Sequence, residues 1–126
     1  MIGLDSTFII DLINGHAGAR RRAQEIGDEP ILVSSVAAFE IMLGIFQRNT
    51  PREPFDEFLD NSDVIDVDRS VANKAAQLQS QLFKKGRPIS IADLLIVASY
   101  LQNGCNRVLT RDARFDQIPG IVVERY

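Results

Sequence analysis

Four acidic residues stand where a carboxylate could do chemistry: Asp5, Glu40, Asp93 and Asp112. Asp5 and Asp112 directly follow short apolar runs, whereas Glu40 and Asp93 lie on otherwise apolar faces of predicted helices. Two unit charges ~4 Å apart repel by about 4 kcal/mol at an effective dielectric of 20. If these acids meet, they therefore need either a bound cation or raised pKa values.

An oxygen-only group of ligands without His or Cys suits Mg²⁺ or Mn²⁺ better than zinc. Such an ion can polarise a phosphoryl oxygen and help to generate hydroxide for in-line attack on a phosphodiester. The chemistry that these residue types predict is thus metal-assisted hydrolysis of a phosphodiester.

Each acid also has an ordinary structural explanation. Asp5 could be a helix N-cap, Asp93 lies three residues after Ser90 in a near capping-box arrangement, Asp112 could close an Asx-turn, and Glu40 could pair with an arginine. These explanations do not say why all four acids fall at positions predicted to face one end of a sheet.

The elements that would position the acids alternate along the chain. Apolar runs predict strands at residues 1–5, 31–33, 63–67, 108–110 and 120–123, of which 63–67 has the polar alternation of an edge strand. Helices are predicted at 6–13, 19–26, 36–47, 51–61, 68–83 and 91–102. This alternation favours a three-layer α/β/α fold with a mostly parallel five-stranded sheet. Ligands bind such sheets at the carboxyl ends of the strands, which is where Asp5 falls.

Composition limits the function classes. The 126 residues suit one domain, spanning 1–126. The net charge of −3 argues against binding nucleic acid by bulk charge, though not against a local basic rim. The single cysteine, Cys105, excludes an internal disulfide and is expected to be packed, and the lone His16 argues against a His-based triad. With no apolar run near ~20 residues and no signal-peptide start, we expect a cytoplasmic protein without a membrane span.

Four stretches of the chain, taken together, resemble a known family. They are Ile2–Ser6, Val33–Ser34 with Ala38–Gly44, Ile91–Ala98, and Val108–Phe115. In this order, and across essentially the whole chain, they look like PIN-domain ribonucleases, and especially the VapC-type toxins of toxin-antitoxin pairs. The resemblance implies a PIN-like fold and a Mg²⁺- or Mn²⁺-dependent endoribonuclease that hydrolyses RNA. Such proteins are commonly homodimers inhibited by a cognate antitoxin.

By this resemblance Asp5, Glu40, Asp93 and Asp112 match the acidic quartet, and Ser6 and Thr110 match the small hydroxyl positions beside it. We assign Asp5 and Asp93 as direct metal ligands and Asp112 as a ligand directly or through water. Glu40 would orient the attacking water or hold a second ion.

The fourth acid has an alternative in Asp116. We favour Asp112 because its distance from Phe115 fits the Thr-x-Asp-x-x-Phe form of the motif. Basic residues near the motifs are candidate contacts to RNA phosphates, with solvated surface as the competing interpretation: Arg111, Arg114, Lys84, Lys85 and Arg87.

Two other functions compete with the nuclease. The first is a PIN-like domain with a degraded site that binds RNA or a protein without cutting. The second is a phosphate-handling α/β domain, either a receiver or a haloacid-dehalogenase-like phosphatase. The phosphatase needs an acid where Thr7 stands, and the receiver needs a lysine where the strand 108–110 leads to Arg111.

Overall fold

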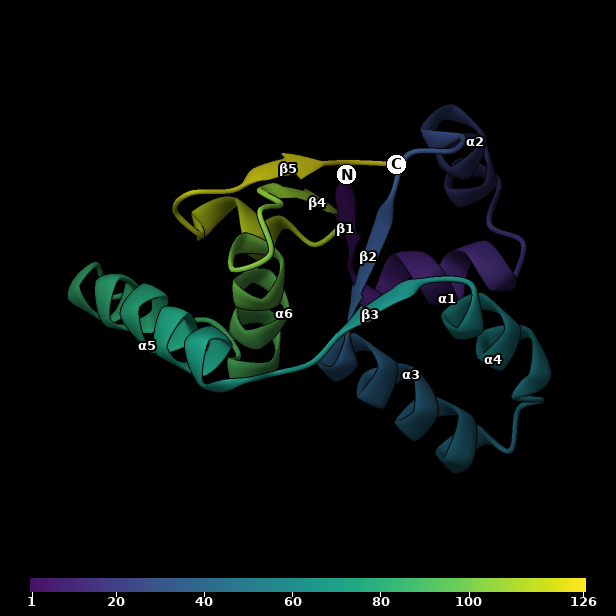
Figure 1. Ribbon diagram of the computed structural model, residues 1–126, viewed down its shortest axis with the longest axis horizontal. Coiled ribbons are helices and arrows are strands. Elements are labelled where there is room, and N and C mark those ends of the chain that lie inside the picture. Colours follow the sequence, from purple (N-terminus) through teal and green to yellow (C-terminus); the bar gives the residue numbers. More distant parts are fainter.

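The computed structural model describes residues 1–126 and contains a five-stranded sheet in the order β3-β2-β1-β4-β5 (Figure 1). Every neighbouring pair is parallel. The strands are β1 (Ile2–Leu4), β2 (Ile31–Ser34), β3 (Asp63–Ile65), β4 (Arg107–Leu109) and β5 (Val122–Glu124). The predicted parallel sheet is confirmed, and β3 lies at an edge as its alternating pattern indicated.

Six helices flank the sheet: α1 (Ser6–Ile13), α2 (Ala17–Ile26), α3 (Ser35–Arg48), α4 (Glu53–Asp60), α5 (Arg69–Lys84) and α6 (Ile91–Leu101). In Figure 1 α5 and α6 lie on one side of the sheet, and α1, α2 and α4 lie on the other. The predicted three-layer α/β/α architecture is therefore confirmed. None of the helices has the length and apolar character needed to cross a bilayer.

Local sequence explains where most helices begin. The side chains of Ser34, Asp68 and Ser90 accept hydrogen bonds from backbone N–H groups in the first turns of α3, α5 and α6, as N-caps do. Asp5 occupies the N-cap position of α1, but its side chain makes no capping hydrogen bond. Its carboxylate is therefore left for other interactions.

Some boundaries differ from the prediction. The second helix begins at Ala17 because His16, which is exposed, accepts a hydrogen bond from the backbone of Ala19 and caps it. A short 3-10 helix, η1 (Ala113–Gln117), was not predicted, and β5 lies slightly later than 120–123. The expectation that Cys105 is packed is confirmed, since this free cysteine is buried.

The central strands β1 and β4 lie in the core, where Ile2, Leu4, Val108 and Leu109 are fully buried. Strands covered by helices on both faces are expected to be continuously apolar, which holds for β1 and for the last two residues of β4. The carboxyl ends of three neighbouring strands, β2, β1 and β4, thus lead out of one rigid core toward the same edge of the sheet.

Candidate metal-dependent nuclease site

Four segments meet at the carboxyl edge of the sheet. Asp5 follows β1, and Asp112 lies three residues after the end of β4. Glu40 lies in the second turn of α3, the helix that leaves β2, and Asp93 lies in the first turn of α6. Because β2, β1 and β4 are neighbours, the topology brings these segments to one place.

Asp5 is the most buried of the acids, with 4% of its surface exposed. The Thr110 hydroxyl donates a hydrogen bond to its Oδ2 at 2.8 Å, and its own N–H donates to the Leu109 carbonyl. Burial first, and then the charges of Asp93 and Glu40, raise the pKa of Asp5 to about 6, although the hydrogen bond from Thr110 lowers it. The charged form of Asp5 is thus held in an environment that disfavours it.

Glu40 and Asp93 are in the same situation. Burial, and then the charge of Asp93, raises the pKa of Glu40, although the Ser6 hydroxyl donates to its Oε1 at 3.1 Å. The pKa of Asp93 is raised by burial and by the charge of Asp112, while Ser90 and Arg114 lower it. The mutual repulsion shows that the predicted acids are electrostatic neighbours.

Asp112 is the exception among the four acids. Its backbone N–H donates to the Thr110 hydroxyl at 3.0 Å, and its carboxylate accepts from the Arg114 backbone N–H at 2.9 Å, as in the Asx-turn that the sequence allowed. The guanidinium of Arg114 also binds it, which lowers the pKa of Asp112.

Asp116, the alternative fourth acid, is exposed and pairs with Arg125 at 2.5 Å. It raises the pKa of none of the other acids, whereas Asp112 raises that of Asp93. The geometry therefore favours Asp112 over Asp116, and the metal-binding role of either acid stays a prediction.

The donor set fits a hard divalent cation. All of its donors are oxygens, and Asp5, Glu40 and Asp93 have raised pKa values that a cation would lower. In the positions that the side chains occupy, however, no group of three or more His, Cys, Asp or Glu could hold a metal ion. Both oxygens of Asp112 are bound to Arg114. The acids are gathered, but their ligand geometry is not preassembled.

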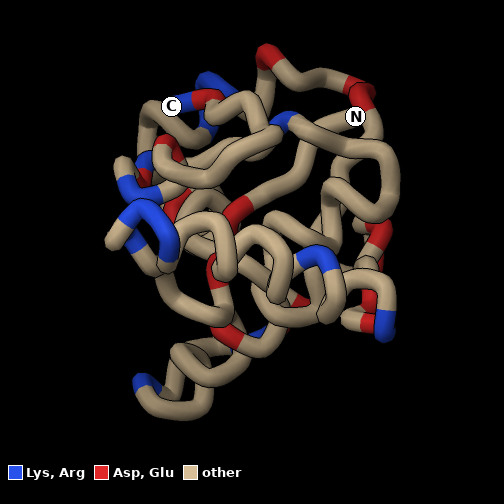
Figure 2. Tube along the Cα trace, turned by 90° about the vertical axis from the view of Figure 1, so that its left-hand side faces the viewer, with Lys and Arg blue, Asp and Glu red and all other residues tan.

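The basic residues that could contact phosphate differ in whether an ion pair already engages them. Arg111 pairs with Asp11 at 3.3 Å, and Arg114 binds Asp112. Lys84, Lys85 and Arg87 are exposed at the end of α5 and in the loop after it, and no ion pair engages them. Figure 2 shows Lys and Arg gathered mainly along one side of the trace, with several acids through its middle. Their contact with RNA stays a prediction.

Tyr100, which no sequence motif had marked, joins the strands of the site. Its buried hydroxyl donates to the Leu4 carbonyl and accepts from the Ser34 N–H at 3.1 Å, joining the ends of β1 and β2 to α6. The ring fits only because residue 3 is glycine, since a Cβ there would lie 2.2 Å from a ring carbon of Tyr100. An isolated glycine in a strand signals such a close approach, so Gly3 was the available clue.

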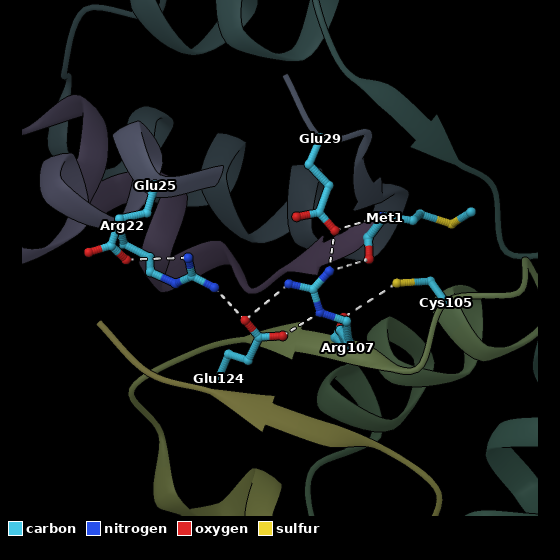
Figure 3. A network of polar contacts seen from close by, with 7 residues as sticks. All are labelled: Met1, Arg22, Glu25, Glu29, Cys105, Arg107 and Glu124. Carbon is cyan, nitrogen blue, oxygen red and sulfur yellow. Dashed lines mark hydrogen bonds and ion pairs between the residues drawn. The ribbon is translucent and has the colours of Figure 1, made fainter. Parts of the chain in front are cut away.

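A second group of acids is engaged by cations (Figure 3). The guanidinium of Arg107, the first residue of β4, binds Glu29 and Glu124, and Arg22 also pairs with Glu124. The amino group of Met1 and then Arg107 lower the pKa of Glu29, and Arg107 followed by Arg22 lowers that of Glu124. These two acids thus have cationic partners and lowered pKa values, whereas Asp5, Glu40 and Asp93 have raised ones.

Comparison with curated proteins finds relatives across nearly the whole chain. The chain is 23% identical over 124 residues to the tRNA(fMet)-specific endonuclease VapC of Shigella flexneri, covering 96% of this chain and 94% of that protein. It is 23% identical over 128 residues to Ribonuclease VapC2 of Rickettsia felis, covering 98% and 96% of the two chains.

Solved structures share the fold. The VapBC2 complex of Rickettsia felis bound to a promoter DNA fragment contains a chain that matches with a TM-score of 0.86 at 23% identity, covering 99% of this chain and 98% of that one. DNA-bound VapBC of Salmonella typhimurium matches with a TM-score of 0.85 at 24% identity, covering 98% and 96%. The family model described as PIN domain matches residues 2–121. This chain therefore belongs to the PIN domain family, and VapC proteins are among its relatives.

Proposed function

We propose that this protein is an endoribonuclease that hydrolyses RNA phosphodiesters with the help of Mg²⁺ or Mn²⁺. One observation supports the proposal above all others. Acids that follow β1 and lie on α3 and α6 gather at one edge of the sheet, and burial together with mutual repulsion raises the pKa of Asp5, Glu40 and Asp93. Such an arrangement costs stability, so it is expected where a cation is to be bound.

In the proposed site Asp5 and Asp93 would hold the ion directly, with Asp112 as a further ligand. A bound divalent ion would supply Lewis-acid polarisation of the scissile phosphate and a water of lowered pKa. Thr110 fixes Asp5, and Ser6 fixes Glu40. Glu40 would accept a proton from the attacking water, a role that its raised pKa favours.

The relatives support the substrate class and the partner. Curated relatives are named as an endonuclease specific for tRNA(fMet) and as a ribonuclease, and the matched structures are complexes with a VapB partner. We therefore assign this protein as the toxin of a toxin-antitoxin pair, bound and inhibited by a cognate antitoxin. The gene order offers a check, since a small adjacent reading frame with a DNA-binding front half is expected.

A non-catalytic alternative has one observation in its favour. Because no ligand group for an ion is preassembled, the domain could bind RNA or a protein partner without cutting. Metal binding by the purified protein separates this alternative from the nuclease. The receiver and phosphatase interpretations are set aside, because the PIN domain match covers residues 2–121.

The proposed function is tested by cleavage of total RNA with 5 mM Mn²⁺, with Mg²⁺, or with chelator. The wild type should cut in the presence of either ion and stop with chelator. Asp93→Asn should reduce the rate by at least about 100-fold while the circular dichroism spectrum stays unchanged, because a ligand carboxylate is lost.

The matched control is Asp60→Asn, which removes an exposed acid at the end of α4 and should cut like the wild type. Equal cleavage by Asp93→Asn and the wild type would point to a contaminating nuclease and overturn the assignment of the site.

A further inference from the structure

Arg114 binds both carboxylate oxygens of Asp112. Its Nε lies 3.1 and 3.0 Å from the two carboxylate oxygens, and Nη2 lies 2.6 Å from Oδ2. The backbone N–H of the same residue also donates to Oδ1. Both oxygens of this carboxylate are thus engaged by one residue, and the lone pairs that a metal ion would need are largely taken.

The guanidinium also acts on the rest of the acidic group. The charge of Arg114 lowers the pKa of Asp93, and Asp112, Asp93 and Asp5 together raise the pKa of Arg114. A single side-chain cation therefore offsets part of the repulsion that a divalent ion would otherwise relieve. Arg114 thus reduces the repulsion among the acids as an ion would, but its electrostatic attraction acts mainly on Asp112.

The contact can open easily. The Arg114 side chain is 65% exposed and that of Asp112 is 26% exposed. Exposed ion pairs contribute little to stability because water and salt screen them. A divalent cation carries twice the charge and can approach several carboxylates at once, so it is the stronger competitor for Asp112.

We infer that Arg114 is a built-in competitor for the divalent-ion site: its guanidinium binds Asp112 in the metal-free protein and must leave Asp112 when the ion takes that carboxylate. This inference rests on the proposed function. After release the guanidinium lies on an exposed rim beside the acids, where it can bind a phosphate oxygen of the RNA. Arg114 would then be a positioning residue that couples ion binding to phosphate binding.

The test is a titration with Mn²⁺, in which the electron paramagnetic resonance signal of the free ion reports binding without any turnover. Arg114→Gln should bind Mn²⁺ roughly three- to fivefold more tightly than the wild type, because an exposed ion pair no longer competes. The gain should shrink at high salt. Arg114→Lys, which keeps the charge but loses the forked geometry, should fall between the two.

The matched control is Arg52→Gln, which removes the same charge from an exposed Arg–Asp pair with Asp56 on α4. Its affinity for Mn²⁺ should equal that of the wild type. Unchanged or weaker binding by Arg114→Gln, in a protein whose wild type binds Mn²⁺ and whose Asp93→Asn variant does not, would overturn the inference and leave the proposed function standing. Absence of binding by both the wild type and Arg114→Gln at millimolar Mn²⁺ would instead contradict the proposed metal site itself.

Discussion

At the scale of single residues, the site stores electrostatic strain in Asp5. A buried carboxyl with neighbouring acids resists ionisation, and the Thr110 hydroxyl compensates only in part. The folded-state pKa of about 6 lies above the ordinary value of 3.8. This group therefore favours folding most at a pH below its ordinary pKa, and that contribution is lost as the pH rises through about 6.

Replacing this carboxyl tests the strain. Asp5→Asn keeps an oxygen for the Thr110 hydroxyl but cannot ionise, so in chelator at pH 7.5 it should raise the free energy of unfolding by about 3 kcal/mol. Near pH 4 the gain should almost vanish. Urea unfolding at both pH values measures the difference. An exposed acid such as Asp66 gives the control, since Asp66→Asn should change stability by less than about 0.5 kcal/mol. A gain in stability of equal size at both pH values would contradict the inference that the ionised carboxyl of Asp5 destabilises the fold.

At the scale of helices and strands, the sequence predicted the boundaries that depend on neighbouring residues in the chain. Capping side chains such as Ser34 and Ser90 and the apolar run before Asp5 marked real helix and strand boundaries. It could not reveal contacts that fold topology makes. The hydroxyl of Tyr100 contacts Leu4, which is 96 positions away in the chain, and Ser34, which is 66 positions away. No rule based on sequence spacing predicts these contacts.

The same limit applied within the site. The sequence named the four acids, because their positions relative to strands and apolar helix faces are local features. It did not show that Arg114 would occupy Asp112, since the choice between a phosphate contact, a solvated side chain and an ion pair depends on the path of η1. It favoured Asp112 over Asp116 by the spacing of the former to Phe115, but it could not show that Asp116 pairs with Arg125.

The Tyr100 bridge makes a prediction for the elements that it joins. Tyr100→Phe should lower the free energy of unfolding by about 1–3 kcal/mol, because the Leu4 carbonyl and the Ser34 N–H lose a partner in the core. Tyr126→Phe is the matched control. The Tyr126 hydroxyl donates to Asp11, which keeps Arg111 and solvent as partners. Tyr126→Phe should therefore lower the free energy of unfolding by less than Tyr100→Phe. Urea unfolding measures both variants, and a larger loss in Tyr126→Phe would contradict the bridging role.

At the scale of the whole molecule, α3 leaves a large apolar face uncovered. Phe39, Leu43 and Phe46 share one side of this helix and are 63%, 44% and 68% exposed. Contiguous exposed apolar side chains often mark a contact with another protein. We propose that two copies associate through this face, which agrees with the homodimer that the resemblance implies.

Sedimentation velocity tests this assembly. The wild type should sediment as a dimer at about 50 µM, and Leu43→Glu should yield monomers, because a buried unpaired charge is costly at an interface. Val122→Glu, which alters an exposed apolar residue on the edge strand β5, should leave the dimer intact. A monomeric wild type, or a dimer that survives Leu43→Glu, would contradict an interface at α3.

Acids from distant segments gather at the carboxyl edge of the sheet, and we propose that together they bind a divalent ion. The most direct test is an anomalous difference map, collected near the manganese absorption edge, from crystals soaked in Mn²⁺. We predict a peak within coordination distance of carboxylate oxygens of both Asp5 and Asp93, with Arg114 turned away from Asp112. A map from well-diffracting crystals with no peak between these carboxylates, and with Arg114 still bound to Asp112, would contradict the account.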